Sequence, residues 1–180
     1  YFKIKNNLLK NSEYRIYNYD DNLLKKSYNF LSKGIWISSK SNEEIKKECD
    51  YWINDAGFIV ERKFKLFNTE VFNLRGQHNL QNLLLATAAA RKIGLSSLQI
   101  YNSLKSYKQL PHRLETIYKN DHIEIINDSK ATNFESSIAS LNSICNSSVL
   151  ISGGKMKDGN PKLWVQTINK KAESIFLYGE

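Results

Sequence analysis

Residues 123–133 read IEIINDSKATN, an apolar run followed at once by polar and small side chains. The apolar run Ile123–Ile126 predicts a buried strand, and a helix is expected to begin near Phe134. The turn between them carries an acid, Asp128, and a lysine, Lys130. Ligands of α/β sheets bind at the carboxyl ends of strands, and the helix that follows offers free backbone N–H groups to anions. The stretch therefore predicts an α/β fold and a candidate ligand site.

A purely structural turn would explain part of the same stretch. Thr132 and Glu135 have the spacing of a capping box, with Thr132 as the N-cap of the helix. Asp128 and Ser129 suit a turn because their side chains can bond to the nearby backbone. Lys130 has no such explanation. On the residues alone, a structural turn and a ligand site are equally open alternatives.

Composition limits the class of protein. The chain has 180 residues, of which 41% are hydrophobic and 24% charged, as in ordinary globular domains. No run approaches the roughly 20 apolar residues of a membrane span, and the first residues do not resemble a signal peptide. The first residue is not Met, so the chain is expected to be a piece of something longer. The net charge of +8 comes from scattered lysines without an aromatic stripe, which argues against a nucleic-acid partner.

The cysteines and histidines form no recognisable metal site. Cys49 and Cys145 lie far apart and belong to no CxxC pair, which favours a reducing compartment. The three histidines, His78, His112 and His122, lack metal-ligand spacing. The sequence therefore predicts no metal ligands within this segment.

The residues before Gly76 are expected to form mixed β structure and loop. Alternating or short apolar runs predict strands at 15–18, 34–38, 51–54, 58–62, 65–67 and 71–74, the third and fourth joined as a hairpin around Gly57. Leu and Ala at helical spacing then predict a helix over 79–93, with Asn79 as its N-cap. A capping box at 96–99 predicts a second helix that ends near Tyr107.

Pro111 disfavours helical geometry before it, so we place a domain junction between residues 1–109 and 110–180. Beyond it, strands and helices alternate with short loops, which predicts a parallel sheet with right-handed crossovers. The expected elements are strands at 123–127, 149–152 and 175–178 and helices at 134–143 and 161–171. The fold class is therefore α/β: part of a mixed-sheet domain, then the first half of a Rossmann-like parallel-sheet domain.

Three further groups of residues could bind a ligand. Asn79 and Asn82 lie three apart at a helix start, so their amides could read a base edge, although capping alone would explain Asn79. Arg113 at the junction could grip a phosphate, or it could form a structural ion pair. Residues 154–159 read GKMKDG and lack the Gly-Lys-Ser/Thr ending of a phosphate loop. One of the two lysines in this loop, Lys155 or Lys157, could meet an anion, or the loop could simply be solvated.

Four motifs in series resemble the Mur ligase family. Each motif is weak alone, but their order and intervals are specific, and the resemblance covers nearly the whole chain, closely from Gly76 onward. The third motif is most similar to that of the D-glutamate-adding members. The motifs are Gly76-Gln77-His78-Asn79-x-x-Asn82, Leu110-Pro111-His112-Arg113-Leu114-Glu115, Asn127-Asp128-Ser129-Lys130-Ala131-Thr132-Asn133 and Ser152-Gly153-Gly154-x-x-Lys157.

The resemblance implies a domain assignment and a nucleotide site. Residues 1–109 would be the C-terminal part of an ATP-binding central domain, and residues 110–180 the start of the Rossmann-like, amino-acid-binding C-terminal domain. Asn79 and Asn82 would lie near the adenine. Arg113 would reach the nucleotide phosphates and Asp128 would lie near the ribose, whose hydroxyls an acid suits.

The resemblance also implies a reaction. Lys130 would be the catalytic residue facing the nucleotide, while Thr132 and Lys157 would hold the carboxylates of D-glutamate. The activity would be ATP-dependent amide formation between UDP-N-acetylmuramoyl-L-alanine and D-glutamate through an acyl phosphate. Mg²⁺ would be required, with its ligands and the phosphate loop outside this segment, so the segment alone is expected to be inactive.

The setting implied is peptidoglycan precursor synthesis in the bacterial cytoplasm, which serves cell-wall growth, cell shape and division. The implied enzyme is a monomer whose partners are small molecules, without nucleic acid or membrane. Two alternatives stay open. One is another amide ligase of the superfamily, such as a folylpolyglutamate synthase. The other is a non-catalytic basic module that holds an acidic partner, for which a salt-sensitive affinity for random DNA would be the sign.

Overall fold

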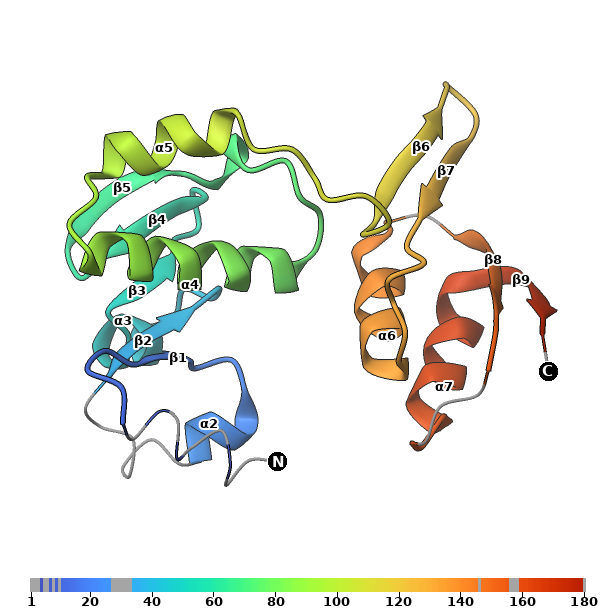
Figure 1. Ribbon diagram of the computed structural model, residues 1–180, viewed down its shortest axis with the longest axis horizontal. Helices are drawn as coiled ribbons and strands as arrows, with labels where there is room; N and C mark the ends of the chain where they lie inside the picture. The colour runs from blue at the N-terminus through green and yellow to red at the C-terminus, as the bar shows by residue number, and fades with distance from the viewer. Residues whose placement is uncertain are drawn as a thin grey trace. The chain divides into compact units, whose positions relative to one another are not determined.

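A computed structural model describes residues 4, 7, 9, 11–26, 34–145, 147–155 and 159–179. The chain divides into two compact units: a first unit of residues 1–73 and 79–107, and a second unit of residues 74–78 and 108–180 (Figure 1). Among the described residues, no helix is long and apolar enough to cross a membrane. Each unit has its own sheets and its own helices.

The first unit is built on one mixed sheet. The sheet contains, in chain order, β1 (Ile16–Asn18), β2 (Ile35–Ser38), β3 (Tyr51–Ile53), β4 (Phe58–Glu61) and β5 (Phe64–Asn68). β1, β2 and β3 run parallel, while β3, β4 and β5 form an antiparallel meander. The predicted hairpin at 51–62 is confirmed. Its turn contains Gly57 at a φ of 77°, a left-handed conformation that glycine adopts at little cost.

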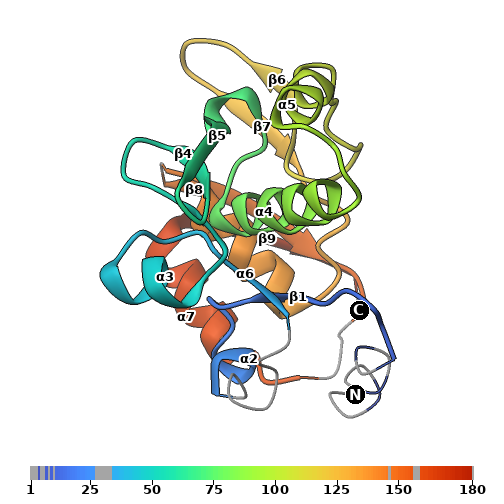
Figure 2. The same cartoon turned by 90° about the vertical axis from the view of Figure 1, so that its left-hand side faces the viewer.

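Alternation along the strands sends apolar side chains to both faces of this sheet. One face packs against α4 (Gln77–Lys92) and α5 (Ser97–Lys105), and Leu84 and Ala88 of α4 have no exposed surface. Figure 2 shows this pair of helices beside the sheet. The buried cluster on this face contains Ile37, Tyr51, Ile53, Ile59, Phe67, Leu83, Leu84, Ala88 and Ile100.

The other face of the sheet is covered mainly by α3 (Glu43–Glu48), whose single buried residue is Ile45. This cluster is aromatic: Tyr17, Tyr19, Trp36, Ile45, Cys49, Trp52 and Val60 are its buried members. Neither α3 nor the short α2 (Asn22–Lys26) was expected from the sequence. Both have too few residues for apolar periodicity to identify them. The first unit therefore has helices on both faces of its sheet.

Two boundaries in this unit differ from expectation. α4 begins at Gln77, so Asn79 is its third residue and the prediction that Asn79 is the N-cap is wrong. Gly76, at a φ of 94°, turns the chain directly before the helix and lets it start two residues early. The strand expected at 71–74 is also wrong. A 3₁₀ turn, η2 (Thr69–Val71), stands at its start, capped by the side chain of Asn68. The capping box of Ser96 and Gln99 at the start of α5 is confirmed.

The second unit alternates strands and helices after an antiparallel hairpin. Its elements are β6 (Glu115–Lys119), β7 (Glu124–Asn127), α6 (Phe134–Ser143), β8 (Ser148–Gly153), α7 (Lys162–Lys171) and β9 (Ala172–Tyr178). β8 and β9 are parallel and joined through α7, as the alternation predicted. The α/β fold class, with a mixed sheet and parallel strands, is confirmed.

One strand of the second unit has a different partner from the one expected. The strand predicted at 123–127 pairs with β6, antiparallel, rather than with the parallel strands. β6 was not predicted, because its residues ETIYK lack clean alternation and four of the five are exposed. Lys119 lies opposite Glu124 in the register, so polar pairs contribute to holding the hairpin.

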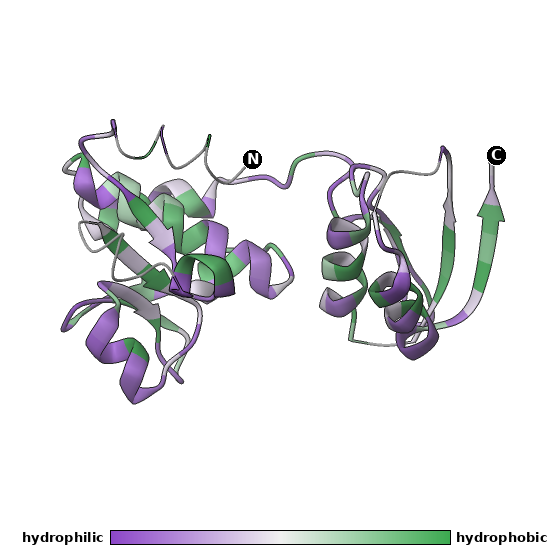
Figure 3. Cartoon of the chain, turned by 90° about the horizontal axis from the view of Figure 1, so that it is seen from below, coloured by the Kyte–Doolittle hydropathy of each residue, from purple (hydrophilic) through white to green (hydrophobic). Residues whose placement is uncertain are grey.

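α6 and α7 lie side by side (Figures 1 and 3). The rings of Phe134 and Trp164 are 5.5 Å apart, and Trp164 donates from Nε1 to Ser137 Oγ at 2.9 Å. The strands are less covered. Ile151 of β8 is 72% exposed and Leu177 of β9 is 70% exposed, and Figure 3 shows these strands as apolar.

Candidate functional site

Two motifs that are distant in sequence meet in the second unit, at the carboxyl end of β7. The turn of residues 110–115 lies on the loop of residues 127–133. The backbone N–H of Lys130 donates to the carbonyl of His112 at 3.1 Å. The side chains of Asn127 and His112 are hydrogen-bonded at 2.8 Å between Nδ2 and Nδ1. These bonds create one continuous polar surface from both motifs.

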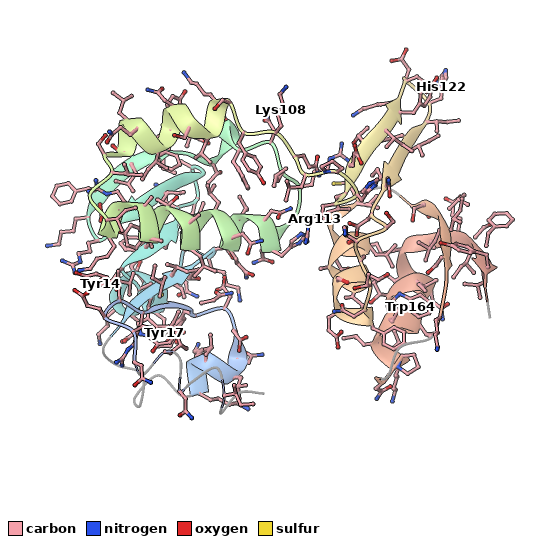
Figure 4. The ribbon with its side chains drawn as sticks, viewed as in Figure 1. Tyr14, Tyr17, Lys108, Arg113, His122 and Trp164 are labelled. Atoms are coloured by element: carbon pink, nitrogen blue, oxygen red, sulfur yellow. The ribbon has the colours of Figure 1, made fainter. Side chains whose placement is uncertain are left out.

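Arg113 lies in the middle of the turn, two residues before β6 begins, and is labelled in Figure 4. Its neighbours His112 and Leu114 both have left-handed backbones, with φ of 64° and 51°. Such conformations are uncommon outside glycine and cluster at functional sites. Arg113 is exposed, and among the described residues its guanidinium makes no ion pair or hydrogen bond. The structural ion pair that the sequence left open is not found there, and the group is free to meet a ligand.

Asp128 is half-buried and holds the turn in place. Its Oδ1 accepts a hydrogen bond from the backbone N–H of Leu114 at 2.9 Å. Its Oδ2 accepts a hydrogen bond from the hydroxyl of Ser140 on α6. Each carboxylate oxygen has a further lone pair, so a ligand hydroxyl could still donate to Asp128. The carboxylate thus has a structural task in addition to any contact with a ligand.

Lys130 and Thr132 follow Asp128 in the same loop. Both are exposed, and neither side chain has a hydrogen-bond partner among residues that the structure describes. The prediction that Thr132 caps α6 is wrong. The N-cap is Asn133, which accepts from the N–H of Ser136 at 2.8 Å and has the extended backbone that caps require. Because Asn is the stronger cap, the Thr132 hydroxyl has no capping role and is available to a ligand.

The loop after β8 is pressed against the end of β9. A side chain at Gly153 would meet the carbonyl oxygen of Tyr178 at 1.9 Å, so only glycine fits there. Gly154 has a φ of 107° and donates its N–H to the same carbonyl at 3.0 Å. Lys155 is exposed. Lys157, predicted to hold a carboxylate, lies outside the described residues.

The remaining predicted residues are on α4. Asn79 and Asn82 are three apart in this helix, so they share one face. Asn82 is exposed and has no side-chain hydrogen bond within the described part of the chain, whereas Asn79 is half-buried. An amide pair in this arrangement could present a donor and an acceptor to the edge of a base.

A polar network near the same helix was missed by the sequence analysis. Asp20 follows β1 and accepts hydrogen bonds from Ser38 Oγ at 2.7 Å and from Ser39 Oγ at 2.6 Å, both at the end of β2. Asp20 also accepts from Gln81 Nε2 of α4 at 3.1 Å. Burial alone would raise the pKa of Asp20, but the hydrogen bonds from Ser39, Ser38 and Gln81 outweigh it and lower that pKa.

Two features of the sequence could have revealed this network. The polar pair Ser38-Ser39 follows one short apolar run, and Asp20 follows another. The carboxyl ends of parallel strands meet at one edge of a sheet, so the juxtaposition could have been inferred once β1 and β2 were known to be parallel. The network links the strand ends to α4, the helix that carries Asn79 and Asn82.

His78 has a neutral ring near neutral pH. Burial lowers the pKa of His78, and the nearby charge of Asp128 offsets part of this effect. A neutral imidazole can accept as well as donate a hydrogen bond.

No group of three or more His, Cys, Asp or Glu side chains that could hold a metal is found in the part of the chain that the structure describes.

Comparison with proteins of known sequence gives a consistent answer. No protein-family model matches the chain. The chain is 59% identical over all 180 residues to a UDP-N-acetylmuramoylalanine–D-glutamate ligase of Prochlorococcus marinus strain MIT 9515. It is 38% identical over 179 residues to the ligase of the same name from Parasynechococcus marenigrum strain WH8102. The alignments cover 38% and 39% of these relatives, so the chain spans about two fifths of their length.

Solved structures show the same fold. A MurF ligase of Thermotoga maritima, in complex with ADP, matches 99% of this chain with a TM-score of 0.62 and 16% sequence identity. A MurF of Acinetobacter baumannii matches 92% of it with a TM-score of 0.59 and 18% identity. These matches cover 47% and 38% of the two solved chains. At such identities the likeness concerns the fold alone.

Proposed function

Because the chain belongs to the Mur ligase family, we propose that it is a segment of the ligase that joins D-glutamate to UDP-N-acetylmuramoyl-L-alanine with hydrolysis of ATP. The observation that carries this proposal is the alignment of the whole chain, at 59% identity, with a ligase of that name. The polar surface formed by residues 110–115 and 127–133 supports it, because its cationic and hydroxyl groups at the end of a strand have no partner among the described residues.

In this proposal residues 1–109 are the C-terminal part of the ATP-binding central domain, and residues 110–180 begin the amino-acid-binding domain. The change of compact unit between Tyr107 and Lys108 supports a boundary in this region. The enzyme would work as a monomer in the cytoplasm, in the synthesis of peptidoglycan precursors. Its partners would be small molecules: ATP, the UDP-sugar substrate and D-glutamate.

Asn79 and Asn82 would read the adenine edge through their amides, and Asp128 would accept from the ribose hydroxyls. The Arg113 guanidinium would bind the phosphates, for which its planar fork is suited. The unpaired state of Arg113 supports this role, since no protein carboxylate among the described residues competes for it. The ADP bound to the MurF of similar fold is in keeping with a nucleotide site.

The reaction would proceed in two steps. The terminal carboxylate of the UDP-sugar substrate attacks the γ-phosphorus of ATP, which gives an acyl phosphate and ADP. The amine of D-glutamate then attacks the acyl carbon, loses a proton, and the tetrahedral intermediate expels inorganic phosphate to leave the amide. The Lys130 ammonium would stabilise the negative charge that develops on the transferred phosphoryl group. Thr132 and Lys157 would bind the carboxylates of D-glutamate through a hydroxyl and an ammonium.

Mg²⁺ would neutralise part of the phosphate charge when bound. In this proposal its ligands come from outside this segment.

The proposal is tested with the full-length protein and with the 180-residue chain in parallel. The full-length protein should release phosphate only when ATP, UDP-N-acetylmuramoyl-L-alanine and D-glutamate are all present. L-Glutamate and L-lysine in place of D-glutamate separate this activity from that of other amide ligases. The 180-residue chain alone should hydrolyse no ATP. Turnover with another amino acid in preference to D-glutamate would refute the substrate assignment.

A further inference from the structure

Arg113 has a backbone that needs outside support. The residues on both sides of it, His112 and Leu114, are left-handed, and neither is glycine. Leu114 is also buried, with only 6% of its surface exposed. A branched, bulky residue in this conformation persists only when its surroundings fix it. Identifying what fixes it therefore identifies what aims the Arg113 side chain.

On the Leu114 side of the turn, the carbonyl of Arg113 accepts from Gln109 Nε2, and the N–H of Leu114 is held by the carboxylate of Asp128. Its Oδ1 accepts the Leu114 N–H at 2.9 Å, across fourteen residues of sequence. The His112 side of the turn has other partners. The carbonyl of His112 accepts from the Lys130 N–H at 3.1 Å, and the N–H of His112 donates to Glu115 Oε2 at 2.8 Å. Asp128 lies on the proposed ligand surface and also bonds to the backbone of the turn, next to Arg113.

The second oxygen of the Asp128 carboxylate is hydrogen-bonded to Ser140. The hydroxyl of Ser140, on α6, donates to Asp128 Oδ2. The same hydroxyl lies 2.9 Å from the carbonyl of Ser136, but it has one hydrogen, and the charged carboxylate is the stronger acceptor. Ser140 is half-buried, behind the proposed ligand surface. Its bond to Asp128 is therefore a link between the body of α6 and the turn.

We infer that Ser140 is a positioning residue for nucleotide binding: through Asp128 it fixes the turn that presents Arg113. This inference rests on the proposed function, in which Arg113 binds the phosphates. The link runs from the Ser140 hydroxyl to the Asp128 carboxylate, from there to the Leu114 N–H, and so to the backbone of Arg113. Loss of the hydroxyl frees the carboxylate to rotate, and the backbone at Leu114 then loses one of its restraints.

The test compares Ser140→Ala with Ser143→Ala in the full-length protein. Ser143 is a matched control on the same helix, since its hydroxyl bonds only to the Ser140 carbonyl, at 2.7 Å, in the described structure. Hydrogen exchange at the Leu114 amide should become about tenfold faster in Ser140→Ala, the equivalent of one charge-assisted hydrogen bond, and stay unchanged in the control. Ser140→Thr, which keeps the hydroxyl, should restore the protection.

Kinetics separate positioning from a general loss of structure. In Ser140→Ala the KM for ATP should rise about tenfold while kcat changes by less than about twofold. The KM for D-glutamate should stay the same. Unchanged Leu114 exchange, or faster exchange with an unchanged KM for ATP, would overturn the inference. Arg113→Ala is measured beside it: if its KM for ATP is normal, the role of Arg113 in the proposed function fails, while the exchange data still decide whether Ser140 fixes the turn.

Discussion

The first unit buries apolar side chains on both faces of its sheet, whereas the second unit buries only three of its described hydrophobic residues. Those three are Leu114, Leu141 and Ile168. The loops of the second unit are fixed instead by hydrogen bonds from side chains, above all those of Asp128. Packing therefore sets the geometry of the first unit, and polar bonds set that of the second. Substitutions should affect stability most in the first and activity most in the second.

The largest effect is expected from truncating a core leucine of the first unit. Leu84 on α4 has no exposed surface and lies in the larger apolar cluster. Leu84→Ala should lower the free energy of unfolding by about 3–5 kcal/mol, through lost burial and the cavity left behind. Leu141→Ala, on α6, should cost about 2 kcal/mol, because Leu141 belongs to neither of the two buried clusters. Urea unfolding followed by circular dichroism measures both.

Leu98→Ala is the control for these leucines, since Leu98 is helical but 65% exposed. It should change the free energy of unfolding by less than about 0.5 kcal/mol. If Leu141→Ala lowered the free energy of unfolding as much as Leu84→Ala does, core packing would stabilise the second unit as strongly as the first. The contrast between the two units would then be lost.

The next prediction is a substitution that lowers activity and leaves stability unchanged. Lys130→Met in the full-length protein should lower kcat by about 10²–10³-fold, because the side chain would stabilise charge on the transferred phosphoryl group. Lys130 is exposed and has no partner among the described side chains, so the melting temperature should not fall. Lys119→Met, an exposed lysine of β6 in the same unit, is the control and should retain full kcat. A large loss of stability with Lys130→Met would mean that polar groups of the second unit cannot be altered independently of its fold.

Substitution of a polar group of the first unit, Asp20, should instead lower the stability of the protein. Asp20→Asn should destabilise the protein by about 1 kcal/mol at neutral pH, after allowing for solvent screening of a half-exposed carboxylate. The pKa of Asp20 is lowered in the folded state, so its stabilisation is complete above the ordinary carboxyl pKa of 3.8 and is lost as the pH falls through the lower folded value.

The pH series makes this prediction specific. As the pH falls below 3.8 and through the lower folded pKa of Asp20, wild type should lose more stability than Asp20→Asn does, so that the difference between them shrinks. Asp121→Asn is the control, because Asp121 is exposed in the β6–β7 turn. Identical acid dependence in wild type and Asp20→Asn would show that hydrogen bonds to Asp20 do not stabilise the carboxylate form.

Local patterns in the sequence predicted most of the fold. Apolar runs and turn residues located β1 to β5, and helical spacing identified the buried residues of α4. The capping box at Ser96 was found because both partners lie within four residues. β6 was missed, since its strand character comes from pairing with β7 and not from its own residues. A prediction from periodicity requires that burial alternate along the element itself.

The candidate site was predictable in its residues but not in its connections. The polar turn after β7 identified Asp128, Lys130 and Thr132 as a group. The bond from Leu114 to Asp128 spans fourteen residues, and the bond from Ser140 spans twelve, so neither has a local pattern. Left-handed backbone at a leucine is likewise contrary to its intrinsic preference and depends on tertiary contacts.

The smallest effect on stability is expected at the cysteines, which report on the two units separately. Cys145 in the second unit is exposed, and Cys145→Ser should change the free energy of unfolding by less than about 0.5 kcal/mol. Cys49 in the first unit is 6% exposed, and burial, reinforced by the charges of Asp20 and Asp50, raises its pKa to about 12. At pH ~8 an aromatic disulfide reagent should therefore label Cys145 quickly and Cys49 only when the first unit opens.

Combined with the leucine variants, this labelling tests the contrast between the units directly. Leu84→Ala should accelerate the labelling of Cys49, because it weakens the unit that encloses this thiol. Leu141→Ala should leave that rate unchanged, because it weakens the other unit. Equal labelling of both thiols in the native wild type would show that the first unit opens as readily as the second, and packing would then not be what distinguishes them.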